Sequence, residues 1–143
     1  MNKKILIASD HAGFDLKQKL IEQMPKDIFE NLGTNSLEMV DYTDYANELA
    51  GRISKNNNKK GILICGTGVG MSVAANKFKN IRAGLVYNSE VAKLIREHND
   101  ANILVLPGKY MDIHEAKKCV DNFLSSSFEG GRHMRRLNKI IEN

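Results

Sequence analysis

Apolar residues along the chain follow two alternating patterns. Continuous apolar runs, such as "KKILIAS" (3–9), "KGILICG" (60–66) and "NILVLPG" (102–108), are typical of strands buried on both faces. Between such runs, apolar residues recur every three or four positions, which predicts amphipathic helices. The predicted order is strand 3–9, helix 16–24 ended by Pro25, strand 27–33, helix 45–55, strand 60–66, helix 71–78, strand 81–88, helix 89–98 with Ser89 as its N-cap, strand 102–108, helix 113–124 and a short helix after Gly130 and Gly131.

Strands and helices alternate with short connections, which is typical of parallel strands joined by crossover helices. We therefore expect a single α/β domain over residues 1–143, a Rossmann-like three-layer α/β/α sandwich with a five-stranded parallel sheet plus a C-terminal helix. Ligands of such folds bind at the carboxyl ends of the strands. The polar and glycine residues expected at those ends are Asp10, His11, Cys65 to Gly70, Asn88, Gly108 and Lys109.

Composition narrows the classes of protein. The 143 residues are 42% hydrophobic, enough for one ordinary core, and they contain no apolar run long enough for a membrane span. The apolar run before Asp10 is too short for a signal peptide. Cys65 and Cys119 lie far apart without metal-ligand spacing, so we expect reduced thiols in a cytoplasmic protein, with a single disulfide as the alternative.

The stretch "GILICGTGVGMSVAANKFKNIRAG" (61–84) contains the most specific pattern in the chain. It is not a Walker A motif, because no Lys-Ser/Thr pair follows, and Met71 stands where a dinucleotide fingerprint has its third glycine. The backbone N–H groups around Gly66, Gly68 and Gly70 can converge on an anion at a helix N-terminus. The alternative is a tight strand-to-helix turn that binds nothing.

Cys65 directly precedes these glycines. A lone cysteine at the end of a buried strand is usually a core residue. At a helix N-terminus, beside N–H donors and the Thr67 hydroxyl, the thiolate form is favoured instead. Such a thiolate could be a nucleophile with His11 or His98 as its base, or itself a general base whose neighbouring N–H groups stabilise an oxyanion. Cys119 lies near the apolar face of a predicted helix and is expected to be structural.

The remaining candidates have ordinary alternatives. His98 lies at the end of a predicted helix, where the helix dipole alone favours a histidine. Arg132 and Arg136 are four residues apart and share a helix face, which suits a phosphate but also a solvated basic surface. The net charge of +4 is compatible with binding of nucleic acid or of an anionic small molecule.

Five motifs together resemble the ribose-5-phosphate isomerase B family, which includes the galactose-6-phosphate isomerase subunits. They span nearly the whole chain in the family's order: "SDHAGFDLK" (9–17), "DYTDYA" (41–46), the stretch 61–84, "REHNDANILVLPG" (96–108) and "FEGGRHMRRL" (128–137). The resemblance implies an aldose–ketose isomerase that transfers a proton between C1 and C2 through a cis-enediolate. It also implies a place in the non-oxidative branch of the pentose phosphate pathway, with no metal and no organic cofactor.

The resemblance further implies a role for individual residues. Cys65 would be the base, Thr67 would assist in holding the enediolate, and His98 would help to open the furanose ring. The expected substrate contacts are Asp10, Tyr42 and Asn99 to sugar oxygens, the backbone of Gly66, Thr67, Gly68, Val69 and Gly70 to the enediolate, and His11, Lys109, Arg132 and Arg136 to the phosphate. The resemblance implies a homodimer or homotetramer whose active sites take residues from two subunits, and neither nucleic acid nor a membrane as a partner.

The chain departs from the family's pattern at Lys109, where many members have arginine. An arginine guanidinium can hold a phosphate with two parallel hydrogen bonds, whereas the lysine ammonium acts as a single compact charge. Some relatives use a glutamate elsewhere as the base, and Cys65 places this chain with the cysteine subgroup. A six-carbon substrate such as galactose 6-phosphate or allose 6-phosphate is a close alternative. A non-catalytic module that binds phosphate or RNA is an alternative of another class, although few aromatics are available for stacking on bases.

Overall fold

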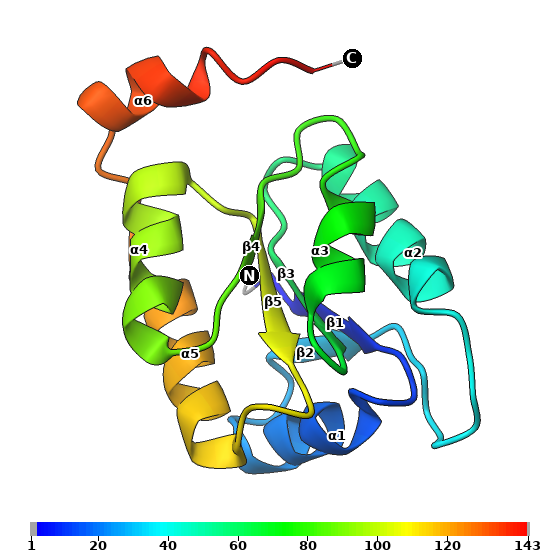
Figure 1. Ribbon diagram of the computed structural model, residues 1–143. Coiled ribbons are helices and arrows are strands. Elements are labelled where there is room, and N and C mark those ends of the chain that lie inside the picture. The colour runs from blue at the N-terminus through cyan, green and yellow to red at the C-terminus, as the bar shows by residue number, and fades with distance from the viewer. Residues whose placement is uncertain (1–2, 143) are drawn as a thin grey trace.

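A computed structural model describes residues 3–142 (Figure 1). Buried leucine, isoleucine and valine runs form the central strands, and the amphipathic segments form the helices around them. The strands are β1 (Ile5–Ser9), β2 (Phe29–Asn31), β3 (Gly61–Cys65), β4 (Ala83–Leu85) and β5 (Ile103–Pro107). The helices are α1 (Phe14–Gln23), α2 (Tyr42–Ser54), α3 (Val69–Ala75), α4 (Ser89–Asn99), α5 (Ile113–Ser125) and α6 (Arg132–Leu137).

The five strands form one parallel sheet in the order β2-β1-β3-β5-β4, which confirms the predicted fold class. In the register of β3 and β5, Gly61 pairs with Ile103 and Cys65 with Pro107. The chain winds from β1 outward to β2 and then crosses back to β3, so the direction of winding reverses between β1 and β3. Loops that follow these two strands therefore form the crevice in which such sheets bind ligands.

Each face of the sheet carries its own hydrophobic core. One core joins alternate strand residues, such as Ile62 and Leu104, to α1, α4 and α5. The other joins the residues between them, such as Leu63 and Val105, to α2 and α3 and includes Cys65. Successive side chains of a strand point to opposite faces of the sheet, so the Cys65 side chain lies on the face covered by α2 and α3. Helix α3 is the one that begins within the glycine stretch.

The last helix lies apart from the sheet. Figure 1 shows α6 beyond the end of α4 at which the chain enters β5, and the two helices are in contact. Within residues 3–142, no helix combines the length and the apolar character needed to cross a bilayer.

Element boundaries differ from the predictions at several ends. The strands predicted at 27–33 and 81–88 shorten to three residues each, and the helix predicted at 45–55 begins at Tyr42. Ser89 is not an N-cap: the Asn88 side chain accepts a hydrogen bond from the N–H of Val91 at 2.9 Å, so Asn88 caps α4. Asparagine and serine are equally good N-cap residues, so the sequence pattern alone could not distinguish Asn88 from Ser89.

Candidate active site

The loops after β1 and β3 meet at the carboxyl edge of the sheet. Asp10 follows β1 directly, and its carboxylate is nearly buried and accepts a hydrogen bond from the N–H of Gly13 at 3.0 Å. The backbone of Gly13 lies so close to β3 that a Cβ there would collide with the carbonyl group of Ile64. The missing side chain therefore lets the loop that carries Asp10 and His11 lie directly against the strand that ends in Cys65.

The glycine stretch after β3 exposes unused backbone donors. Among the described residues, the N–H groups of Gly66, Thr67 and Gly68 have no hydrogen-bond acceptor, and we call these three groups the cradle. Gly68 caps α3 at φ +80°, and a Cβ there would collide with Leu85. Only glycine satisfies both conditions without strain. The cradle thus places three donors without acceptors just before α3, and donors at a helix N-terminus can stabilise a negative oxygen.

Thr67 fixes the rest of this turn. Its Oγ1 accepts a hydrogen bond from the N–H of Val69 at 3.2 Å, so the hydroxyl proton is free to point toward a ligand. The N–H of Val69 is thereby occupied and adds less to anion binding than its neighbours do. Tyr42, at the start of α2, packs against the same turn, because a Cβ on Gly70 would lie 2.5 Å from its ring.

Cys65 occupies the end of β3 next to the cradle, and only 5% of its surface is exposed. The N–H of Gly108 donates to the carbonyl of Cys65 at 2.7 Å, and the N–H of Lys109 donates to the carbonyl of Gly66 at 3.0 Å. These two bonds attach the loop after β5 to the glycine stretch. They place the Lys109 side chain beside Gly66, with its Cδ 3.4 Å from the position of a Cβ there.

His11 has a defined tautomer when it is neutral. Its Nδ1 accepts a hydrogen bond from the N–H of Val40 at 3.2 Å, so the proton resides on Nε2 and can be donated to an anion. The carboxyl edge therefore combines a thiol, the cradle, and the cationic or donor groups of Lys109 and His11.

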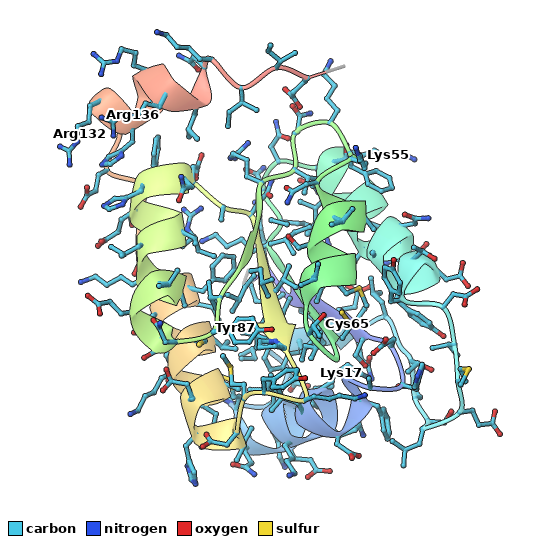
Figure 2. The ribbon with its side chains drawn as sticks, in the orientation of Figure 1. Lys17, Lys55, Cys65, Tyr87, Arg132 and Arg136 are labelled. Atoms are coloured by element: carbon cyan, nitrogen blue, oxygen red, sulfur yellow. The ribbon has the colours of Figure 1, made fainter. Side chains whose placement is uncertain are left out.

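The other predicted residues lie at the opposite edge. His98 and Asn99 end α4, just before β5 begins, whereas Cys65 pairs with the last residue of β5. The length of β5 thus separates the two groups, roughly 13 Å along the strand alone. Arg132 and Arg136 are exposed on α6, the helix whose His133 contacts His98, and Figure 2 shows both far from Cys65. One chain does not bring Cys65 together with His98, Asn99, Arg132 and Arg136.

Comparison with known proteins identifies the family. A family described as Ribose/Galactose Isomerase matches residues 5–140. The chain belongs to the ribose/galactose isomerase family. It is 48% identical to a probable ribose-5-phosphate isomerase B of Mycoplasma pneumoniae over 99% of this chain and 95% of that protein.

Solved structures of this family have the same fold. A ribose 5-phosphate isomerase of Thermotoga maritima matches with a TM-score of 0.89 and 49% identity, covering 97% of each chain. Ribose-5-phosphate isomerase B of Mycoplasma genitalium, solved with bound ribulose-5-phosphate, matches with a TM-score of 0.89 and 44% identity. That match covers 96% of this chain and 93% of the other.

Two residues of this ribose/galactose isomerase that contact candidate residues, one at each edge of the sheet, were not singled out from the sequence. The hydroxyl of Tyr87 donates to the carbonyl of Thr67 at 2.8 Å and so fixes the cradle from the end of β4. Tyr87 could have been found from its position at the carboxyl end of the strand predicted at 81–88, where only Asn88 was named as a candidate. His133 stacks on His98, with ring centroids 4.3 Å apart and 11° between the planes.

The environment of His133 is unusual. Burial and the nearby charges of His98, Arg132 and Arg136 lower its pKa, although Glu129 acts in the opposite direction. Its Nε2 lies 3.5 Å from Oε1 of Glu129 and forms no hydrogen bond with any described residue. These effects favour the neutral form of His133, whose ring is stacked on His98.

The second thiol has a different character. Cys119 is fully buried in the core between α5 and the sheet, and burial raises its pKa to about 12. A thiol of this kind is neither a nucleophile nor a base near neutral pH. Cys119 is consequently a structural residue, as its position on the predicted apolar face indicated.

Proposed function

We propose that this chain interconverts D-ribose 5-phosphate and D-ribulose 5-phosphate, with Cys65 as the base. The observation that supports this most directly is Cys65 at the end of β3 beside the cradle, a thiol next to unused N–H donors. The Mycoplasma genitalium relative with bound ribulose-5-phosphate has nearly the same fold, which supports a substrate of that class.

In the proposed reaction, the open-chain aldose presents its C2–H bond to the Cys65 thiolate. The thiolate removes the C2 proton, and the electron pair of that bond forms the C1–C2 double bond of a cis-enediolate. The negative charge moves to O1, where the cradle and the Thr67 hydroxyl stabilise it. O1 then takes the proton of the C2 hydroxyl, C1 takes the proton held by the thiol, and the ketose results.

The phosphate is assigned to positive and N–H groups rather than to the cradle. Lys109 lies beside Gly66, and His11 can present an Nε2 proton at the same edge. Arg132 and Arg136 add two guanidinium groups on one helix face, a geometry that suits phosphate oxygens. Asp10, Tyr42 and Asn99 are assigned to sugar hydroxyls.

A homodimer resolves the separation of the two groups. His98, Asn99, Arg132 and Arg136 of one copy would complete the carboxyl edge of another, with His98 opening the furanose ring there. The exposed side chains of Val69 and Val73 on α3, next to the cradle, support a surface that a second copy covers. Two such dimers could form a tetramer. Both cysteines are free, which is compatible with a cytoplasmic protein.

The test is isomerisation of ribose 5-phosphate by the purified protein in EDTA, with ribulose 5-phosphate as the measured product. Cys65→Ala should lower kcat by about 10² to 10⁴-fold, because a positioned base contributes that much. Cys119→Ala is the matched control, since it removes a thiol that plays no part in the reaction. Equal activity of Cys65→Ala and the wild type would refute the base, and dependence on added metal would refute the mechanism.

The same assay separates substrates by size. Rates with allose 6-phosphate and galactose 6-phosphate are compared with the rate for ribose 5-phosphate as kcat/KM. A higher value for a six-carbon phosphate would leave the chemistry in place and change the proposed substrate.

A further inference from the structure

Three potential metal ligands meet at the amino edge of the sheet, far from Cys65. They are His98 at the end of α4, Glu129 in the loop before α6, and His133 on α6, and their ligand atoms all lie within 4.8 Å of one another. The loop is attached at this point, because the N–H of Glu129 donates to the carbonyl of Glu97 at 3.0 Å. Backbone structure therefore keeps Glu129 next to His98, independently of any attraction between their side chains.

Hydrogen bonds within this cluster do not satisfy His133. Its side chain is 7% exposed, and its buried Nε2 has no hydrogen-bond partner among the described residues. Leaving a buried polar atom unpaired is costly, and such atoms call for an explanation. This Nε2 lies 3.5 Å from Glu129 Oε1, close to the roughly 3.3 Å that separates two ligands of a tetrahedral zinc ion with bonds of about 2.0–2.1 Å.

We propose that His98, Glu129 and His133 form a binding site for a zinc-like divalent cation. Two imidazole nitrogens and one carboxylate oxygen are ligands that Zn²⁺ accepts, and three protein ligands leave a fourth position for water or an anion. Calcium and magnesium prefer sites made of oxygen alone, so they are excluded as good occupants.

The free protein needs only side-chain movement to close around the ion. The imidazole planes, now 11° apart, must open so that a nitrogen of each ring points to one metal. His98 is half-buried and the Glu129 side chain is 51% exposed, so both can rotate toward the fixed His133. The positive charges of Arg132 and Arg136 act on His133 and lower the affinity for a cation, but they favour an anion as the fourth ligand.

The consequence for the enzyme is inhibition. A metal-bound His98 nitrogen can no longer exchange a proton with the sugar ring, so zinc should stop ring opening. This consequence, unlike the binding itself, rests on the proposed function. It distinguishes this site from a catalytic metal, because removing the ion should raise the rate.

Binding is tested on the full-length protein after EDTA treatment and desalting, with Co²⁺ as a spectroscopic probe and Zn²⁺ in calorimetry. We expect visible bands of four-coordinate cobalt and about one zinc ion per chain. Glu129→Gln and His133→Asn should each weaken binding by at least about a hundredfold, more than the loss of a supporting residue around a metal. His114→Asn, an exposed histidine on α5, is the matched control and should bind normally.

Other outcomes overturn the proposal. Absence of the cobalt bands would do so, and so would binding that survives Glu129→Gln and is lost in Cys65→Ser, because a thiolate would then be the ligand. His133 is buried, so Glu129→Gln, at an exposed position, keeps the test valid if His133→Asn fails to fold.

Inhibition is measured separately with ribose 5-phosphate, each protein being compared with its own metal-free rate. Zinc should inhibit the wild type and His114→Asn but not Glu129→Gln. Zinc binding by a protein without isomerase activity would refute the proposed function and leave the site intact. Isomerase activity that zinc does not affect, despite the cobalt bands, would refute the inhibitory role.

Discussion

The two edges of the sheet are built differently. At the carboxyl edge, backbone hydrogen bonds join the loops after β3 and β5, and glycines let the loops after β1 and β3 touch. At the amino edge, the candidate residues stand on the ends of helices, and the arginines of α6 are exposed. The carboxyl edge is therefore organised by the fold of one chain, whereas the amino edge presents side chains outward.

This difference suggests a division of work between copies. The groups that we propose for proton transfer, Cys65 and the cradle, lie where glycines and backbone hydrogen bonds constrain the loops. Arg132 and Arg136, which we propose as phosphate ligands, stand on α6, a helix that packs on α4 and lies apart from the sheet (Figure 1). We expect both edges to be needed and to be supplied by different copies.

The strongest test mixes two inactive variants. Cys65→Ala damages the carboxyl edge and His98→Asn damages the amino edge, so each alone should be nearly inactive. After unfolding and refolding together, half of the dimers are mixed, and each mixed dimer has one intact site of two. Activity should thus return to about a quarter of the wild-type value, because a two-fold dimer distributes chains at random.

The control for this experiment is a mixture of Cys65→Ala with Thr67→Ala, two changes at the same edge. That mixture should show no more than the mean activity of the two variants measured separately, since no site can then be intact. If the Cys65→Ala and His98→Asn mixture also gains no activity over its separate variants while both proteins refold, the site is not shared in this way.

The second prediction concerns substrate binding by the amino edge. Arg132→Ala and Arg136→Ala should each raise KM for ribose 5-phosphate roughly ten- to hundredfold, since a hydrogen bond to a charged group contributes about 1.5–3 kcal/mol. The kcat should change much less. Arg135→Ala, on the same helix and also exposed, is the control and should leave KM near the wild-type value. Equal effects at Arg135 and Arg136 would mean that only overall charge matters.

Sequence analysis predicted the sheet and the carboxyl edge well, because both depend on local patterns. Continuous apolar runs marked the buried strands, and the polar or glycine residues that follow them in the sequence lie at the carboxyl edge, as predicted. Tyr87 and His133 were missed for a common reason. Each acts through a contact with a residue distant in the sequence, Thr67 in one case and His98 in the other, and no spacing predicts such a contact.

The third prediction tests how strictly the carboxyl edge requires glycine. Gly68→Ala combines a positive φ with a collision against Leu85, so unfolding should become easier by about 2–3 kcal/mol. Gly130→Ala is the matched control, because its φ is +72° but no atom lies within 4 Å of the new Cβ. It should cost only about 1 kcal/mol. Equal losses in urea denaturation would show that backbone strain alone decides the cost, without the collision.

The last prediction concerns Lys17, a buried cation near the carboxyl edge. Lys17 is fully buried on α1, and its Nζ donates to Oδ1 of Asn31 at 2.8 Å, at the end of β2. Figure 2 shows Lys17 at the same end of the molecule as Cys65, whereas Lys55 lies at the opposite end. Burial lowers the pKa of Lys17 from 10.5 to about 8.

The sign of the pH dependence follows from proton counts. Between pH 8 and 10.5, Lys17 is mostly neutral in the folded chain and protonated in the unfolded chain. The unfolded state then binds more protons, so Lys17 should increase the free energy of unfolding as pH rises, by up to about 1.4 kcal/mol per pH unit. Urea denaturation of Lys17→Met should lack this contribution, while Lys55→Met, at an exposed site, should follow the wild type. Parallel curves for the wild type and Lys17→Met would mean that the buried ammonium keeps its ordinary pKa, and the carboxyl edge would then contain a stable buried charge.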